Sequence, residues 1–219
     1  MAMNFEQARQ NMVENQVRPW EVLDARVLDV LGRVRREDFV APAHRQLAFA
    51  DLNLPIGHGE VMMKPVLEGR VLQALDLKSG DQVLEIGTGS GFLTACLASL
   101  AGHVTSVDVH ADFIAAAGQR LAQAGIGNVK LETGEAVNTW QPAGQFDAVA
   151  VTGAVHEIPQ RFLGWLKPGG RLLAARGESP VQQVVLITHE GEGRYREENI
   201  LETDLPYLVH AEPPRKFVF

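Results

Sequence analysis

The sequence predicts an α/β protein with a doubly wound, mostly parallel sheet (a Rossmann-like fold), a C-terminal antiparallel hairpin and an N-terminal helical extension. From about residue 82 to 175, short apolar strand-like runs alternate with helical stretches, which is typical of parallel strands joined by right-handed crossovers. The last two strand-like runs, 181–188 and 194–201, are separated by Glu190-Gly-Glu-Gly193, which indicates a hairpin. Before residue 66 the pattern is helical and then irregular.

The individual elements follow from local patterns. We expect strands at 82–86, 103–107, 128–132, 146–151 and 170–175, and helices at 66–77, 92–101, 111–124 and near 158–166. A polar helix over 5–17 should stop at Arg18-Pro19, and apolar residues recur at helical spacing from Leu23 to Val34. Prolines and glycines predict an irregular loop over 51–65. The chain thus divides into an extension, 1–65, and a main domain, 66–219, which together form one compact unit.

Composition excludes several classes of protein. The net charge of −7 disfavours a phosphate-binding surface for nucleic acid. No apolar run approaches the ~20 residues of a membrane helix, and the first residues lack the apolar core of a signal peptide. The single Cys96, placed among leucines of a predicted helix, is interpreted as a core residue. We expect a cytoplasmic protein, monomeric or a weak homodimer, that binds neither nucleic acid nor membranes.

A glycine-rich turn follows the first strand of the alternating region. Gly87, Gly89 and Gly91 stand between the strand 82–86 and a helix, where backbone can approach a ligand closely. Their spacing is G-x-G-x-G, whereas the dinucleotide fingerprint would require glycine at the position of Phe92. Three alternating glycines exceed what a tight turn needs. The sequence therefore favours a nucleoside-containing ligand other than a dinucleotide at this turn.

Asp108 ends the following strand, about 20 residues past the glycine turn, which is the position of a ribose-binding acid. Its carboxylate can accept hydrogen bonds from both ribose hydroxyls, and Val109 follows it directly. The alternative for Asp108 is a helix N-cap for 111–124.

Two further acids are candidates for ligand contacts. Glu85 falls in a strand that should be buried, so it needs a polar partner or a positively charged ligand. Gly134-Glu135-Ala136 follow the third strand, where an adenine would lie, and Glu135 could accept a hydrogen bond from the exocyclic amino group. The alternative for Glu135 is a solvated turn acid.

Several segments together resemble the protein-L-isoaspartate O-methyltransferases. The segments that carry the resemblance are Val34-Arg-Arg-Glu-Asp-Phe-Val40, Asp51-Leu-Asn-Leu-Pro-Ile-Gly-His-Gly59, Val83-Leu-Glu-Ile-Gly-Thr-Gly-Ser-Gly91, Phe146-Asp-Ala-Val-Ala-Val-Thr152 and Leu166-Lys-Pro-Gly-Gly-Arg171. The resemblance implies methyl transfer from S-adenosyl-L-methionine to the α-carboxylate of L-isoaspartyl residues in damaged proteins, leaving S-adenosyl-L-homocysteine. The methyl ester then cyclises to a succinimide, from which aspartate is recovered.

The resemblance also implies roles for particular residues. Gly87, Thr88, Gly89, Ser90 and Gly91 would hold the methionine end of the cofactor, whose positive charge would lie near Glu85. Asp108 would hold the ribose, and Glu135 stands where the family usually has aspartate beside the adenine.

The reaction-centre segment departs from the family pattern. The family has Gln-Thr-Ile-Ser-x-Pro, with hydroxyls lining the reaction centre, where this chain has Glu60-Val61-Met62-Met63-Lys64-Pro65. Met63 therefore occupies the position of the family's serine and Val61 that of the threonine, either as packing under the loop or as altered specificity. Val61 and Met62 are also expected to contact the cofactor. Lys64 could supply a replacement positive charge. Asp51 could orient a substrate amide, or close a loop turn.

Other functions stay open at this point. The same fold and cofactor could serve another acceptor, either a small molecule or another protein. More remote alternatives are a nicotinamide oxidoreductase and a non-catalytic adenosyl-binding module. The histidines show no paired spacing, so no metal site is expected.

Overall fold

A computed structural model describes residues 3–214 of the chain. Its main sheet has seven strands in the order β5-β4-β3-β6-β7-β8-β9. These strands are β3 (Gln82–Ile86), β4 (His103–Asp108), β5 (Val129–Thr133), β6 (Phe146–Val155), β7 (Leu166–Arg176), β8 (Gln182–Gly191) and β9 (Arg194–Thr203). The strands from β5 to β7 pair in parallel, while β8 and β9 are antiparallel. The predicted mixed sheet with a C-terminal hairpin is confirmed.

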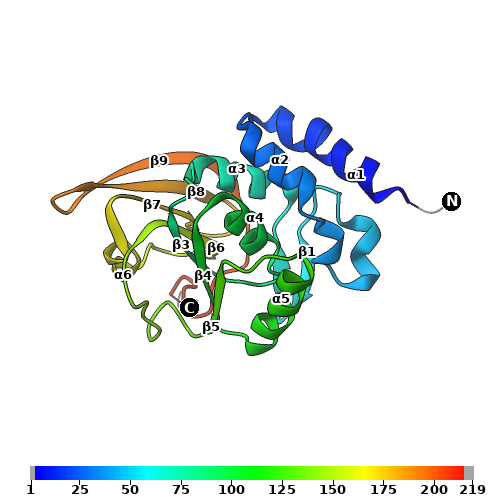
Figure 1. Cartoon of the computed structure of the whole chain (residues 1–219). Coiled ribbons are helices and arrows are strands. Elements are labelled where there is room, and N and C mark those ends of the chain that lie inside the picture. Colours follow the sequence, from blue (N-terminus) through cyan, green and yellow to red (C-terminus); the bar gives the residue numbers. More distant parts are fainter. Residues whose placement is uncertain (1–2, 215–219) are drawn as a thin grey trace, which may run out of the picture.

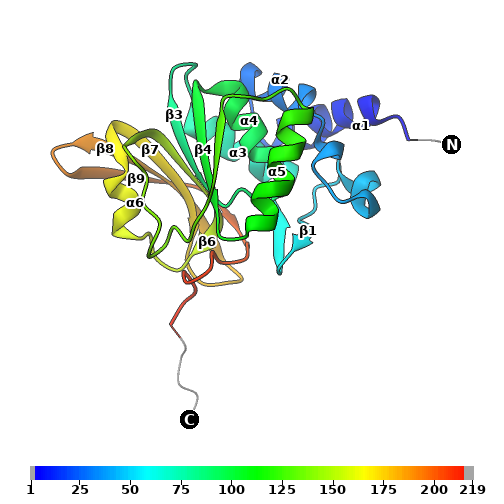
Figure 2. The same ribbon diagram turned by 60° about the horizontal axis from the view of Figure 1, so that its bottom comes forward.

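The central strands β3, β6 and β7 are buried on both faces over most of their length, which explains why they read as nearly continuous apolar runs. Along β3, Val83 belongs to one core cluster, whereas Leu84 and Ile86 belong to the other. Helices α3 (Pro65–Leu75), α4 (Phe92–Leu100) and α5 (Ala111–Gln123) cover the first face, and α6 (Gln160–Gly164) covers the second (Figures 1 and 2).

The N-terminal extension packs against α3 and α4. It consists of α1 (Phe5–Met12), a π-helical turn η1 (Val13–Val17), the 3-10 turn η2 (Arg18–Trp20), α2 (Ala25–Arg33) and the 3-10 turns η3 (Arg36–Asp38) and η4 (Pro42–Leu47). Figure 1 shows α1 and α2 together beside α3 and α4. Met12, Val17 and Leu31 are buried in the same core cluster as Leu72 and Leu97 of the main domain.

Two details of the extension differ from the sequence-based expectation. The α-helix ends at Met12, earlier than predicted, and the chain continues as the π-helical turn η1 to Val17. The predicted stop at Arg18-Pro19 coincides with the 3-10 turn η2, in which proline stands near the N-terminus and its missing N–H breaks no hydrogen bond. The segment predicted as an irregular loop contains a two-stranded hairpin, β1 (Leu54–Gly57) and β2 (Glu60–Met62). Gly57 and Gly59 make the turn between these strands at φ values of 115° and 82°.

The remaining differences are at the ends of elements. The helix α6 is shorter than predicted, and β6 and β7 extend beyond their predicted bounds. Within residues 3–214, no helix has the length and apolar character needed to cross a membrane.

Candidate functional site

A cavity opens where β3 and β4 end at the carboxyl edge of the sheet. The space at this site, counting the open solvent at its mouth, is about 810 Å³. Its lining combines the glycine turn, the end of β4, the segment after β5 and the β1–β2 hairpin. Of the residues predicted as site residues, it brings together Val61, Met62, Met63, Glu85, Gly87, Thr88, Gly89, Ser90, Asp108, Val109, Gly134, Glu135 and Ala136.

The glycine turn is held open by its backbone conformation. Gly87 and Gly89 have φ values of 100° and 50°, and a Cβ atom on Gly87 would lie 2.2 Å from the Thr152 Oγ1 atom. Thr152 Oγ1 donates to the carbonyl oxygens of Ile86 and Gly87, at 3.0 and 2.6 Å. Thr152 of β6 thus fixes the start of the turn. Glycine is required at residue 87 because of both its φ angle and this close approach.

Asp108 connects the glycine turn to the start of α5. One carboxylate oxygen accepts from the Gly89 backbone N–H at 2.9 Å, and the other from the His110 N–H at 2.9 Å. The side chain is buried yet lines the cavity. Each carboxylate oxygen has further acceptor capacity, so a structural role at the start of α5 and a ligand contact are compatible.

Glu85 is fully buried beneath the turn. Its Oε2 atom accepts from Thr94 Oγ1 and Ser106 Oγ, each at 2.5 Å, and Ser106 in turn contacts Thr88 Oγ1 at 2.6 Å. Its Oε1 atom has no protein partner. Burial raises the pKa of this carboxyl to about 8, although the two hydroxyl hydrogen bonds act to lower it. The unpaired oxygen belongs to a residue of the cavity lining, and its contact with a ligand stays a prediction.

The segment after β5 forms another wall. Gly134, Glu135 and Ala136 all line the cavity. The Glu135 carboxylate accepts from the backbone N–H groups of Val137 at 2.7 Å and Asn138 at 3.2 Å. The side chain therefore closes the turn after β5, and its contact with an adenine stays a prediction.

The hairpin side of the cavity is anchored by a buried ion pair. Arg36 contacts Glu68 through Nη1 and donates to the Met63 carbonyl at 2.6 Å and the Ala48 carbonyl at 2.7 Å. Both charged side chains are almost fully inaccessible. Burial raises the pKa of Glu68, and the facing guanidinium of Arg36 acts to lower it. This pair holds the backbone at Met63, whose side chain is buried in the cavity wall.

Two of the predicted site residues lie elsewhere. Asp51 accepts from the Val66 N–H at 3.1 Å and so caps the first turn of α3, outside the cavity lining. Its contact with a substrate amide stays a prediction, because this bond to the helix end engages only one of the two carboxylate oxygens. Gly91 starts α4 at φ 85°, and a Cβ atom there would lie 2.9 Å from the Ala117 Cβ atom. This glycine serves helix packing.

Several lining residues were not predicted from the sequence. Glu60, Glu68, His110, Phe113 and Thr152 all line the cavity. His110 could have been found from its position two residues after Asp108, and Thr152 from its place at the end of a strand. Glu60 stands where the resembled family has glutamine, and burial together with nearby Asp108 raises its pKa. No local pattern marks Glu68 or Phe113.

Comparisons with known proteins agree with this arrangement. A sequence model of the protein-L-isoaspartate(D-aspartate) O-methyltransferase family matches residues 7–209. The chain is 39% identical over 196 residues to protein-L-isoaspartate O-methyltransferase 2 of Anaeromyxobacter sp. strain Fw109-5, covering 89% of this chain and 80% of that protein. It is 41% identical over 171 residues to the protein-L-isoaspartate O-methyltransferase of Vibrio campbellii, covering 78% and 82% of the two chains.

A solved structure supports the fold. It is a Plasmodium falciparum protein described as a protein-L-isoaspartate O-methyltransferase in complex with S-adenosyl-L-homocysteine. It aligns with a TM-score of 0.78 at 19% identity, covering 91% of this chain and 97% of that one. The chain therefore belongs to the protein-L-isoaspartate(D-aspartate) O-methyltransferase family of S-adenosylmethionine-dependent protein repair enzymes, which confirms the resemblance, the enzyme class and the function predicted from its sequence.

Proposed function

We propose that the cavity binds S-adenosyl-L-methionine, whose sulfonium supplies the methyl group, and that the isoaspartyl carboxylate enters beside Val61–Met63. The observation that carries this proposal is the unpaired Glu85 Oε1 atom at the base of the glycine turn. A buried carboxylate oxygen without a partner is unfavourable, and the cofactor's ammonium group would supply the missing hydrogen bonds.

The charge of the cavity supports a cationic ligand. Five acidic residues line it, and no lysine or arginine among the described residues does; the five are Glu60, Glu68, Glu85, Asp108 and Glu135. Glu68 is paired with Arg36, which leaves four acids facing the ligand space, and the raised pKa of Glu85 means that this one carries its charge at neutral pH only when a cationic group faces it. An anionic pyrophosphate would be repelled there, whereas a sulfonium and an ammonium would be attracted. The nicotinamide alternative is therefore disfavoured by charge as well as by glycine spacing.

The remaining contacts follow from the positions of the residues. Asp108 has acceptor capacity for ribose hydroxyls beyond its two backbone bonds. The backbone around Gly134 and Ala136, with Val109 at the end of β4, would enclose the adenine. We assign Glu135 to shaping this wall, because its carboxylate is engaged by Val137 and Asn138.

The chain needs no general base for this reaction. The accepting carboxylate is already ionised at neutral pH, since its reference pKa is near 4. The residues contribute by aligning the acceptor with the methyl group and by excluding water, and alignment alone can supply several orders of magnitude in rate. Met62 and Met63 are buried and Val61 is half-buried, so they present an apolar wall on the acceptor side.

The apolar wall formed by Val61, Met62 and Met63 supports one alternative acceptor. A hydroxyl beside an anionic acceptor would add a charge-assisted hydrogen bond worth about 1.5–3 kcal/mol, or about 10–100-fold in rate. Its replacement by Met63 would favour a more apolar acceptor, either a small molecule or a different protein.

A labelled-methyl assay distinguishes these acceptors. The enzyme is incubated with an isoaspartyl peptide and, separately, with its aspartyl twin. We expect base-labile label on the isoaspartyl peptide alone, with a higher rate in Met63→Ser. Failure to label the isoaspartyl peptide at high enzyme concentration, with S-adenosyl-L-homocysteine binding intact by calorimetry, would contradict the proposed acceptor and leave the cofactor assignment standing.

A further inference from the structure

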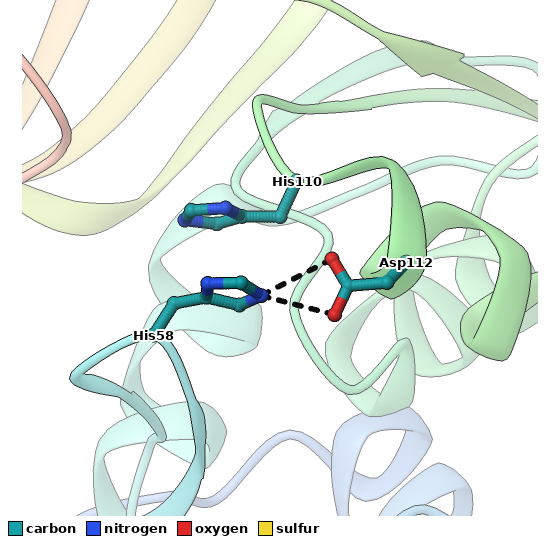
Figure 3. A group of neighbouring side chains, drawn as sticks. All are labelled: His58, His110 and Asp112. Atoms are coloured by element: carbon teal, nitrogen blue, oxygen red, sulfur yellow. Dashed lines mark hydrogen bonds and ion pairs between the residues drawn. The ribbon is translucent and has the colours of Figure 1, made fainter.

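Two histidines and an aspartate meet at the rim of the cavity. His58 comes from the turn of the β1–β2 hairpin, and His110 and Asp112 come from the start of α5 (Figure 3). His58 Nε2 lies 3.2 and 3.0 Å from the two Asp112 carboxylate oxygens. The two imidazole rings are stacked, with centroids 4.0 Å apart and planes inclined by 10°.

These side chains offer one ligand atom each, all within 4.8 Å of one another. We propose that His58, His110 and Asp112 form a binding site for a divalent first-row transition-metal cation such as zinc, nickel or cobalt. Two imidazoles and a carboxylate are ligands that these ions accept, with water completing the coordination. The cation would replace the direct contact between His58 and Asp112.

The geometry requires a modest rearrangement. Metal–ligand distances of about 2.0–2.2 Å bring neighbouring ligand atoms to about 3–3.5 Å from one another. The side chains of His58 and Asp112 are 43% and 65% exposed, so they can turn without disturbing the core. The stacked rings would have to turn edge-on, so that a lone pair of each points to the ion.

Two features position His58, His110 and Asp112 near one another before any ion binds. His58 stands at the hairpin turn with a φ of 53°, in the left-handed region, and its side chain reaches Asp112 of α5. Phe113 packs edge-on against both imidazoles, with centroids 5.2 Å from each ring. The hairpin turn and Phe113 thus fix the positions of both imidazoles before any ion binds.

The surroundings favour a cation. Glu60 and Asp108 are each two residues from one of the two imidazoles in the chain, and both line the cavity. With Asp112, this rim therefore carries three carboxyl groups near two imidazoles. His110, Phe113 and Glu60 also line the cavity, so a bound ion would join the hairpin to α5 directly above the ligand space.

The experiment uses full-length protein without a polyhistidine tag, stripped with a chelator and then dialysed. Co²⁺ is titrated while its visible absorption is recorded, and Zn²⁺ binding is measured by calorimetry. We expect one saturable Co²⁺ site per chain, and added Zn²⁺ should displace the bound Co²⁺. His58→Asn, His110→Ala and Asp112→Asn should each weaken Co²⁺ binding at least about tenfold. Asparagine is chosen at residue 58 because it tolerates positive φ.

His44→Ala is the matched control, since this histidine lies in η4, outside the cluster. It should bind Co²⁺ like the unmodified protein. Circular dichroism spectra of all variants should be unchanged, because the replaced side chains are not part of the core. No saturable binding, or equal affinity in the three variants and the control, would overturn the proposal. Neither result bears on S-adenosyl-L-homocysteine binding, which is measured separately.

Discussion

The two sides of the cavity are built in different ways. On the cofactor side, the glycine turn and Asp108 follow directly from the ends of β3 and β4, two neighbouring parallel strands. On the acceptor side, the β1–β2 hairpin is a separate two-stranded sheet held by Arg36 and Glu68, which are 32 residues apart in the chain. The first side depends on backbone geometry and the second on long-range side-chain contacts.

This difference has a functional consequence. Backbone N–H groups and glycine conformations at a strand end are difficult to change without losing the turn. A hairpin held by side chains can vary in sequence while the cofactor side stays the same. The departures Val61 and Met63 lie on the acceptor side, whereas the glycine turn keeps the family pattern.

The largest expected effect is on the acceptor side. Arg36→Met leaves Glu68 buried without its partner and releases the Met63 carbonyl, so we expect a loss of about 3–5 kcal/mol in the free energy of unfolding. In the double variant Arg36→Met/Glu68→Leu the stability should largely return, since apolar residues can replace a buried pair. Urea denaturation measures both.

The same pair of variants tests the anchoring of the hairpin. The double variant should still show a raised KM for an isoaspartyl peptide, because no group holds Met63. If the double variant regains both its stability and its peptide KM, Arg36 contributes only to folding.

The next effect is on the cofactor side. Gly87→Ala adds a side chain at φ 100° that collides with Thr152 Oγ1, so strain and a lost hydrogen bond together should cost about 2–4 kcal/mol. The displaced turn should also weaken S-adenosyl-L-homocysteine binding, measured by calorimetry. Gly125→Ala is the matched control, with a φ of 71° and open space around it. Equal losses of unfolding free energy and of ligand affinity in Gly87→Ala and Gly125→Ala would show that the collision with Thr152 contributes nothing.

A smaller effect concerns Glu85 and pH. Its pKa is raised to about 8, so it binds a proton at neutral pH, and the cofactor's ammonium requires the carboxylate. S-adenosyl-L-homocysteine binding should therefore tighten from pH 6 to 8, by up to about tenfold per pH unit. Glu85→Gln should remove this slope and weaken binding about 10–100-fold at pH 8. Glu202→Gln, an exposed change on β9, should keep the slope.

The sign for stability is opposite to that for binding. The folded protein holds the Glu85 proton more tightly than the unfolded chain, so this carboxyl lowers the free energy of unfolding progressively as pH rises from about 4.5 to 8. Glu85→Gln should reduce that decline in urea denaturation without ligand. If the free energy of unfolding of Glu85→Gln declines with pH as much as that of the unmodified protein, other titrating groups cause the decline.

The smallest expected effect tests the role of Asp51. As a cap of α3 it should contribute about 1 kcal/mol to stability, so Asp51→Ala should lower the free energy of unfolding by that amount. The kcat/KM for an isoaspartyl peptide should stay unchanged. Asn53→Ala, which removes the neighbouring bond to the Lys64 N–H, is the control. A loss of kcat/KM in Asp51→Ala but not in Asn53→Ala would instead support the predicted contact between Asp51 and the substrate.

The alternating part of the fold could be predicted because each strand or helix carries its own periodic signal. The position of Asp108 relative to the glycine turn was predictable for the same reason, since neighbouring parallel strands end at one edge of the sheet. The hairpin at 54–62 was missed because Pro55 and the two glycines suggested a loop, although its short paired strands tolerate them.

The sequence by itself determined the sheet, the cofactor turn and the family, because these depend on local spacing and on neighbouring strands. The tertiary structure alone decided which groups meet from distant segments. It paired Arg36 with Glu68, turned Asp51 to the end of α3, left Glu85 Oε1 without a partner, and brought His58 to His110. Such contacts join residues far apart in the chain, so no local pattern encodes them, and their energies depend on a burial that only folding produces.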